Sequence, residues 1–279
     1  SRSSRGGQGR SMRAVRTGGY RPRFAAMPAP SGRPPPIAEE PSTSPEATPA
    51  QDGSSTPSSC HSTPTSARLV RRRRSGRALL LPEEEERAAE AASQLSRELG
   101  DVVRICVLGG AVLRGRETEE LVQAVAKELT TSLGERACFL TCAPCTGAQK
   151  HFAEHCGRRS PLWHLVPEGE ASGFSLGRDL HAGADVEQCR EVFDRLGDVF
   201  VTVEGGPDVS QDAQAALSRG AYVVPLMRTG GASSGMFDFP SRALQRPSFA
   251  SKEQWSLLGR SDVPVAASAA ASAAIVEGF

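Results

Sequence analysis

Five short apolar runs, each followed by a polar or helical segment, divide the chain after its first 80 residues. The runs are rich in β-branched and aromatic residues and end at glycine, proline or polar clusters, so they are expected to be buried strands. They cover residues 102–108, 137–141, 162–166, 199–203 and 221–227. Strands that alternate with helices predict an α/β protein with a Rossmann-like three-layer fold. Its sheet is expected to be mainly parallel, with five strands or slightly more.

Start and stop residues mark the expected helices. Pro82 and the four glutamates after it open a helix that Gly100 closes, and Asp185 is suited to cap a helix that runs to Leu196. Residues 168–184 are rich in glycine and serine and long for a connection, which predicts a binding loop. Other helices are expected over residues 121–129, 146–156, 210–217, 252–258 and 264–276.

The first 80 residues have a different composition from the rest of the chain. They contain 14 arginines, no lysine, four acidic residues and 11 of the 20 prolines, whereas residues 81–279 hold 19 basic and 28 acidic residues. Segments of this kind cannot bury enough apolar surface to offset the entropy of ordering. We therefore predict a disordered tail over residues 1–80 and one folded domain over residues 81–279.

Composition also bears on location and partners. No run of 18 or more apolar residues occurs, so we expect no membrane partner. Seven cysteines, mostly within predicted strands or helices, favour reduced thiols and an intracellular protein, cytoplasmic by default. Residues 1–38 contain many arginines and serines and no acid, which is also typical of an organellar transit peptide. Residues 71–74 are all arginine, so we expect nucleic-acid binding, if any, only through the tail.

Two predicted strands end in a pair of glycines, Gly109-Gly110 after the first and Gly205-Gly206 after the fourth. In the commonest doubly wound sheets these two strands are neighbours, and ligands bind beyond their carboxyl ends. Glycines let backbone N–H groups approach a ligand, and the start of the following helix favours an anion. We therefore expect a nucleotide or another phosphorylated small molecule here. Neither turn matches the dinucleotide or P-loop fingerprint.

The segment DVEQCREVFDRLGDVFVTVEGGPDVSQDA, Asp185–Ala213, resembles the LOG (Lonely Guy) phosphoribohydrolases, also labelled lysine-decarboxylase-like. Their signature is a helix with adjacent Arg and Lys, a strand, and then Pro-Gly-Gly-x-Gly-Thr-x-x-Glu. The resemblance runs without gaps from about Val103 to Met227, and the wider relatives are nucleotide-sensing SLOG domains. It implies a Rossmann-like fold, usually a homodimer. It also implies hydrolysis of the bond between a base and ribose 5′-monophosphate, with no cofactor.

The signature positions are only partly matched. Its Arg falls on Cys189 with Arg190 at the Lys, and its closing Glu falls on Asp212. The resemblance therefore implies Arg190 and Asp212 as the candidate catalytic residues. The other departures are Glu204 at the Pro, Asp208 at the third Gly, Val209 at the Thr, and Cys142, Ala143 and Pro144 at an earlier glycine triplet. The expected ligand-binding residues are Gly109, Gly110, Gly147, Gly205, Gly206, Pro207, Asp208 and Val209.

These departures bear on the chemistry. Cleaving an N-glycosidic bond passes through an oxocarbenium-like state and needs a carboxylate near the sugar or the attacking water. Asp212 is one methylene shorter than Glu, and a misplacement of about 1 Å can cost on the order of 100-fold in rate. Asp208 adds a negative charge where a phosphate is expected. We therefore expect binding with weak or no turnover, and an active hydrolase is the alternative.

A third interpretation is a metal or redox protein. Cys142 and Cys145 with His151 and His155 would make a four-ligand zinc set, the two histidines lying one helical turn apart. Cys142-x-x-Cys145 alone has the spacing of a redox pair near a helix start. Ordinary packing also explains buried cysteines, so we expect no metal.

Overall fold

The structure, a computed structural model, describes residues 81–157 and 161–279, so the predicted disordered tail lies outside the described residues. Within the described part, six parallel strands form one sheet in the order β4-β3-β2-β1-β5-β6. This confirms the predicted α/β fold with a parallel sheet. The strands are β1 (Val103–Gly109), β2 (Ala137–Cys142), β3 (Leu162–Val166), β4 (Arg178–His181), β5 (Val199–Val203) and β6 (Tyr222–Pro225).

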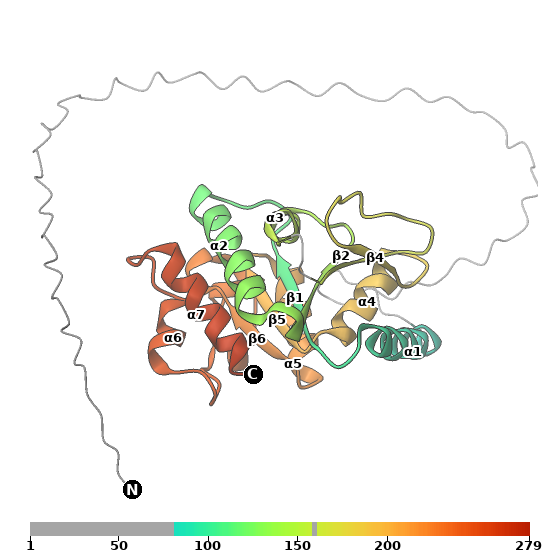
Figure 1. Ribbon diagram of the computed structural model, residues 1–279. Coiled ribbons are helices and arrows are strands. Elements are labelled where there is room, and N and C mark those ends of the chain that lie inside the picture. Colours follow the sequence, from blue (N-terminus) through green and yellow to red (C-terminus); the bar gives the residue numbers. More distant parts are fainter. Residues whose placement is uncertain (1–80, 158–160) are drawn as a thin grey trace, which may run out of the picture. The chain divides into compact units, whose positions relative to one another are not determined.

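Helices cover both faces of this sheet (Figure 1). One face is packed by α2 (Arg116–Leu133), α3 (Gly147–His155) and α7 (Val265–Glu277), with α6 (Lys252–Leu257) against α7. The other is packed by α1 (Pro82–Leu99), α4 (Val186–Leu196) and α5 (Pro207–Ser218). Four short 3-10 helices, Gly134–Arg136, Met227–Thr229, Gly231–Ser234 and Ser241–Leu244, lie in the connections. None of the helices described combines the length and apolar character needed to cross a membrane.

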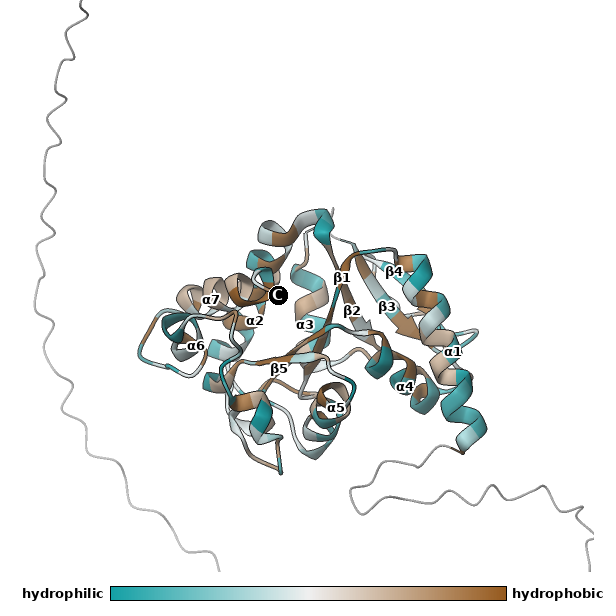
Figure 2. Ribbon diagram, turned by 90° about the horizontal axis from the view of Figure 1, so that it is seen from below, coloured by the Kyte–Doolittle hydropathy of each residue, from teal (hydrophilic) through white to brown (hydrophobic). Residues whose placement is uncertain are grey.

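The apolar runs become strands because both of their faces are buried. Every residue of β2 and of β5 is buried, and neighbouring residues serve different cores: Phe139 packs towards α2 and α3, while Leu140 packs towards α4. Figure 2 shows the strands as a hydrophobic layer between helices of mixed character. Continuous rather than alternating hydrophobicity is what a parallel sheet covered on both faces requires.

The predicted binding loop over residues 168–184 is partly wrong, because it contains a sixth strand. Arg178–His181 pairs in parallel with β3 and forms the edge of the sheet. Only Leu180 of its four residues is buried, so the segment lacks the apolar run by which the other strands were recognised. An edge strand with one buried side chain gives a weak sequence signal.

The expected neighbour relation at the reversal point is confirmed. β1 and β5 lie side by side, with Gly109 opposite Val203 in the register. Asp185 caps α4 by accepting a hydrogen bond from the Gln188 backbone N–H at 2.9 Å. The end of the sheet where β1 and β5 finish is called the carboxyl edge below, and the opposite end is called the amino edge. Both glycine pairs therefore lie at the carboxyl edge.

Candidate functional site

Three turns meet closely at the carboxyl edge. The Gly110 N–H donates to the Val203 carbonyl at 3.3 Å, and the Ala148 N–H at the start of α3 donates to the Gly110 carbonyl at 3.2 Å. Gly147 has φ of +47°, and a side chain there would collide with the Gly110 carbonyl oxygen. Glycine is needed at this turn because the two backbones approach too closely for a side chain to fit between them.

A cavity of about 270 Å³ opens beside these turns. Most of the residues expected from the sequence line it, namely Gly109, Gly110, Arg190, Gly206, Pro207, Asp208, Val209 and Asp212. Gly147 and Gly205 do not line it; they pack behind the surface. Gly205 has φ of +91°, and any side chain there would run into Val209.

Arg190 and Asp212 form an ion pair at this cavity. One Arg190 Nη lies 2.5 Å from Asp212 Oδ2, and Arg190 Nε lies 3.2 Å from both carboxylate oxygens. The Asp212 side chain is 4% exposed and that of Arg190 is 32% exposed. Burial lowers the pKa of the Arg190 guanidinium, but the attraction and hydrogen bond of Asp212 outweigh burial and raise the pKa overall. The guanidinium therefore stays charged, and the pair joins α4 to α5 across the cavity.

The neighbouring signature position, Cys189, points into the core. It is fully buried, and its sulfur lies 3.6 Å from the sulfur of Cys142, the last residue of β2. Cys142 itself lines the cavity. Arg190, one residue further along α4, is therefore the cation that reaches the cavity, and Cys189 and Cys142 form a sulfur pair in the wall behind it.

Two residues that were not among the expected site residues hold nearby backbone in place. Glu204 is buried in the left-handed region, with φ of +48°, and its carboxylate accepts the Arg114 N–H at 3.1 and 3.2 Å. Gln149 lines the cavity, and its side-chain oxygen accepts the Cys142 N–H at 2.8 Å. A glutamate immediately after a buried strand was the available signal for the first. Gln149 had no signal beyond its place on α3.

The four-ligand metal set is not assembled. In the described residues, no three side chains of His, Cys, Asp or Glu lie close enough together to hold a metal ion. Cys145 is hydrogen-bonded to the Thr141 side chain, and Cys142 instead contacts Cys189. The Nδ1 of His155 lies 2.8 Å from the His151 carbonyl within α3, so both histidines belong to the helix surface.

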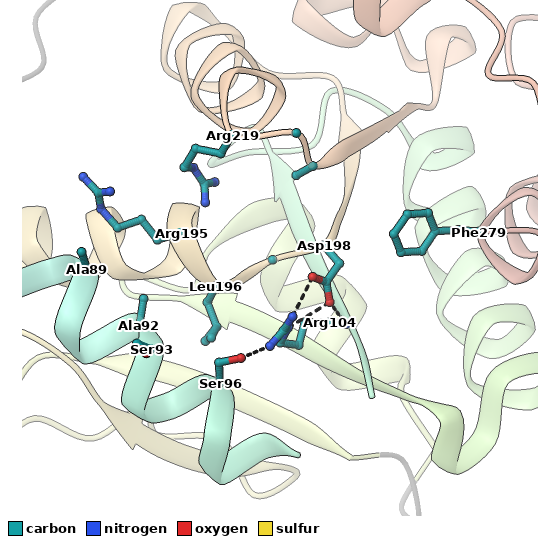
Figure 3. Close-up of a pocket in the computed structure, with 13 residues that line it drawn as sticks. Ala89, Ala92, Ser93, Ser96, Arg104, Arg195, Leu196, Asp198, Arg219 and Phe279 are labelled. Atoms are coloured by element: carbon teal, nitrogen blue, oxygen red, sulfur yellow. Dashed lines mark hydrogen bonds and ion pairs between the residues drawn. The ribbon is translucent and has the colours of Figure 1, made fainter. Parts of the chain in front are cut away.

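A larger cavity of about 460 Å³ lies at the amino edge, near three arginines (Figure 3). Arg104 is held by Asp198, with Nε and Nη at 2.9 and 2.7 Å from its oxygens, and by the Ser96 hydroxyl. Arg195 pairs with Glu191 at 2.9 Å. Burial lowers the pKa of Arg219, while the nearby Asp194 carboxylate raises it. Each arginine thus has a carboxylate near it, and none of the residues that line this cavity begins a helix.

Comparisons with known proteins do not identify a family for this chain. No protein-family model matches the chain, and no curated protein matches it. Among solved structures, the chain is similar to the X-ray structure of TM1055, a target of the Northeast Structural Genomics Consortium. That match has 20% sequence identity and a TM-score of 0.35, and it covers 47% of this chain and 78% of that one. A likeness at this level carries no information on the ligand of this chain.

Proposed function

We propose that the carboxyl-edge cavity binds a nucleotide or a related phosphorylated small molecule, with weak or no turnover. The observation that carries the proposal is the place of the Arg190 guanidinium, which lines the same cavity as the glycine turn at the start of α5. A guanidinium and a helix N-terminus are the two commonest protein groups for holding a phosphate. The fold provides both at the edge where ligands of open α/β sheets bind.

Backbone donors supply the second part of the phosphate site. Pro207 is the first residue of α5 and has no N–H, so the N–H groups of Asp208 and Val209 are the donors that a helix start leaves for a ligand. The aligned peptides add about half a positive charge there. The cavity, at about 270 Å³, is just below the usual range of roughly 300–1,000 Å³ for ligand pockets. A mononucleotide therefore fits it better than a dinucleotide.

The Arg190–Asp212 pair supports weak turnover. Asp212 is the carboxylate that the LOG resemblance assigns to catalysis, and both of its oxygens accept hydrogen bonds from Arg190. A carboxylate neutralised in this way is a poor base and a poor stabiliser of developing positive charge on a sugar. If a phosphate drew Arg190 away, Asp212 would be released, so the alternative of an active phosphoribohydrolase is tested together with binding.

Two adjacent glycines provide a matched test with AMP as the probe. Gly206 has φ of −115°, and a Cβ there meets nothing within 4 Å, so Gly206→Val leaves the fold intact and fills the cavity. Gly205→Val, by contrast, forces a β-branched residue to φ of +91° and a collision with Val209, so it destabilises the protein. The full-length protein should show an AMP-dependent rise in unfolding midpoint, equivalent to about 2.7 kcal/mol at 100 times Kd. Gly206→Val should lose that rise, and it should lower the ligand-free midpoint much less than Gly205→Val does.

Base release from nucleoside 5′-monophosphates separates binding from hydrolysis. We expect slow release by the unmodified protein, and little change in AMP affinity in Asp212→Ala. Rapid release that Asp212→Ala abolishes would make the protein a phosphoribohydrolase. Absence of any AMP effect, with other nucleotides equally silent, would refute both readings.

The LOG resemblance also leads us to propose a homodimer. Sedimentation velocity of the full-length chain tests this separately from ligand binding, and a monomer at micromolar concentration would contradict it.

A further inference from the structure

The sulfur pair Cys142–Cys189 joins two elements that carry the candidate site. Cys142 ends β2 and Cys189 lies in α4, directly before Arg190. Their sulfurs are 3.6 Å apart, while a disulfide bond is about 2.05 Å long. A closing movement of about 1.5 Å, shared between a strand end and a helix, would therefore join them. Cys142 lines the cavity and is 5% exposed, whereas Cys189 behind it is 0% exposed, so a small reagent in the cavity meets Cys142 first.

The alternative partner within the Cys-x-x-Cys spacing lies on the wrong side of the sheet. Successive residues of β2 face opposite layers: Leu140 and Cys142 pack towards α4, whereas Thr141 contacts His164 and belongs to the other side. Cys145 lies in the turn between β2 and α3, where Thr141 and the α3 residues Glu154 and Lys150 act on its pKa. Cys189, 47 residues away in the sequence, is therefore the close neighbour of Cys142.

We propose that Cys142 and Cys189 are a redox modification site that forms a reversible disulfide in the presence of a peroxide and thereby weakens ligand binding in the cavity. The second clause rests on the proposed function. The Cys142 thiolate attacks one peroxide oxygen, the O–O bond breaks, and water leaves as Cys142 becomes a sulfenic acid. The Cys189 sulfur then attacks the sulfenic sulfur, the S–S bond forms, and a second water leaves. Two thiols are oxidised, and one hydrogen peroxide is reduced to two waters.

The bond would act on Arg190 through the helix. Cys189 and Arg190 are consecutive residues of α4, so drawing Cys189 towards β2 shifts and turns the guanidinium relative to Asp212 and to the first turn of α5. Bidentate recognition depends on guanidinium geometry, so a displacement of about 1 Å loses hydrogen bonds rather than weakening all of them slightly. We expect AMP affinity to fall by about tenfold in the oxidised protein and to return when dithiothreitol reduces the bond.

The experiment oxidises the full-length protein with hydrogen peroxide, counts thiols and maps cross-linked peptides without reduction. The expected result is the loss of two thiols and one cross-link between Cys142 and Cys189. Cys142→Ala and Cys189→Ala should each abolish the cross-link. Cys145 does not line the cavity, so Cys145→Ala should leave the cross-link unchanged. A cross-link between Cys142 and Cys145, or irreversible oxidation of Cys142 without a cross-link, overturns the proposal.

The binding measurement distinguishes this proposal from the proposed function. AMP titrations of reduced and oxidised protein are compared, with Cys189→Ala treated identically as the control that cannot cross-link. A mapped Cys142–Cys189 bond with equal AMP affinity in both states refutes the effect on ligand binding. If the reduced protein does not bind AMP, the proposed function fails, and peptide mapping still decides the modification site. Thermal unfolding of the alanine variants shows whether a lost cross-link reflects a lost thiol or a lost fold.

Discussion

The two edges of the sheet each carry an Arg–Asp ion pair beside a cavity, and the two pairs are built differently. At the amino edge, Arg104 lies on β1, and Asp198 directly precedes β5. Asp198 also accepts the Arg104 backbone N–H at 2.9 Å, and both side chains are about a quarter exposed. At the carboxyl edge, Arg190 and Asp212 connect two helices, and Asp212 is 4% exposed. The Arg190–Asp212 bonds are made by side chains alone.

This difference suits the Arg104–Asp198 pair to a structural role and the Arg190–Asp212 pair to an exchange of partners. Asp198 holds two adjacent strands through a backbone donor and a guanidinium together, so its geometry is fixed by the sheet. Arg190 holds Asp212 across a cavity by side-chain bonds between two helices, so under the proposed function its guanidinium would turn towards a phosphate without disturbing a strand. Two ion pairs of the same residue types can therefore have different roles, depending on the other groups that each aspartate binds.

The largest expected effect is that of Arg190→Ala. Removing the guanidinium takes away the ion pair of a carboxylate that is only 4% exposed, which should cost about 3 kcal/mol of unfolding free energy. Asp212→Ala should cost less, about 1 kcal/mol, because Arg190 is a third exposed and can be hydrated. Urea unfolding measures both. The double variant should recover most of the loss, and an undiminished loss in the double variant would show that Arg190 acts through packing instead.

At the amino edge the order of the two partners should be reversed. Asp198→Ala removes the acceptor of both the Arg104 side chain and its backbone N–H and should cost about 2 kcal/mol. Arg104→Ala leaves Asp198 with its backbone donor and should cost about 1 kcal/mol. AMP affinity should be unchanged in both variants, measured by calorimetry. A large affinity loss in Asp198→Ala would mean that the two edges are coupled.

The pH dependence of peroxide oxidation tests whether the Cys142 thiol is protonated at neutral pH. The hydrogen bond with Cys189 and burial raise the pKa of the Cys142 thiol well above its ordinary value. The thiolate is the reactive form, so its fraction and the rate of peroxide-driven cross-linking should rise about tenfold per pH unit between pH 7 and pH 9. The rate is measured by quenching the reaction at set times and counting the thiols that remain. A rate that is flat over this range would require a thiolate already formed at neutral pH, contrary to the raised pKa.

The smallest expected effect concerns the backbone at Glu204. Glu204→Ala loses the bonds to the Arg114 N–H and keeps a non-glycine residue at φ of +48°. Glu204→Gly loses the same bonds and removes the steric cost, so it should be more stable than Glu204→Ala by about 1 kcal/mol. Thermal unfolding of the two variants compares them directly. Equal midpoints would indicate that the turn relaxes when the carboxylate is removed.

Much of the fold could be predicted from local sequence, because both faces of a parallel sheet are buried and leave continuous apolar runs. The five strands recognised from such runs are present, as are the helix start at Pro82 and the cap at Asp185. The strand Arg178–His181 could not be found in this way, since an edge position asks for one buried side chain rather than a run. The prediction that β1 and β5 are neighbours came from the strand order that is common in doubly wound sheets, not from any particular residue.

The candidate site was less predictable, because it depends on distances between elements. Glycine pairs at strand ends pointed to the edge that carries the candidate cavity, but which side chain of α4 reaches that cavity depends on the rotation of the helix. The same is true of the sulfurs: spacing suggested Cys142 with Cys145, whereas strand alternation and packing bring Cys142 to Cys189. Cysteines that are close in the sequence need not be close in space, because successive side chains of a strand point to opposite faces of the sheet.

The adjacency of β1 and β5 also constrains the order in which the protein can fold. Arg104 and Asp198 are 94 residues apart in the sequence, yet they lie on neighbouring strands, so closing this loop costs on the order of 4 kcal/mol of chain entropy before the contacts compensate. β1 and β2 can pair while synthesis continues, but the partner of β1 on its other side emerges much later. Until then the β1 edge stays unpaired, and the Gly109-Gly110 turn has nothing opposite it. The proposed ligand site can therefore form only late, when the segment Val199 to Asp212 docks onto a half-formed sheet.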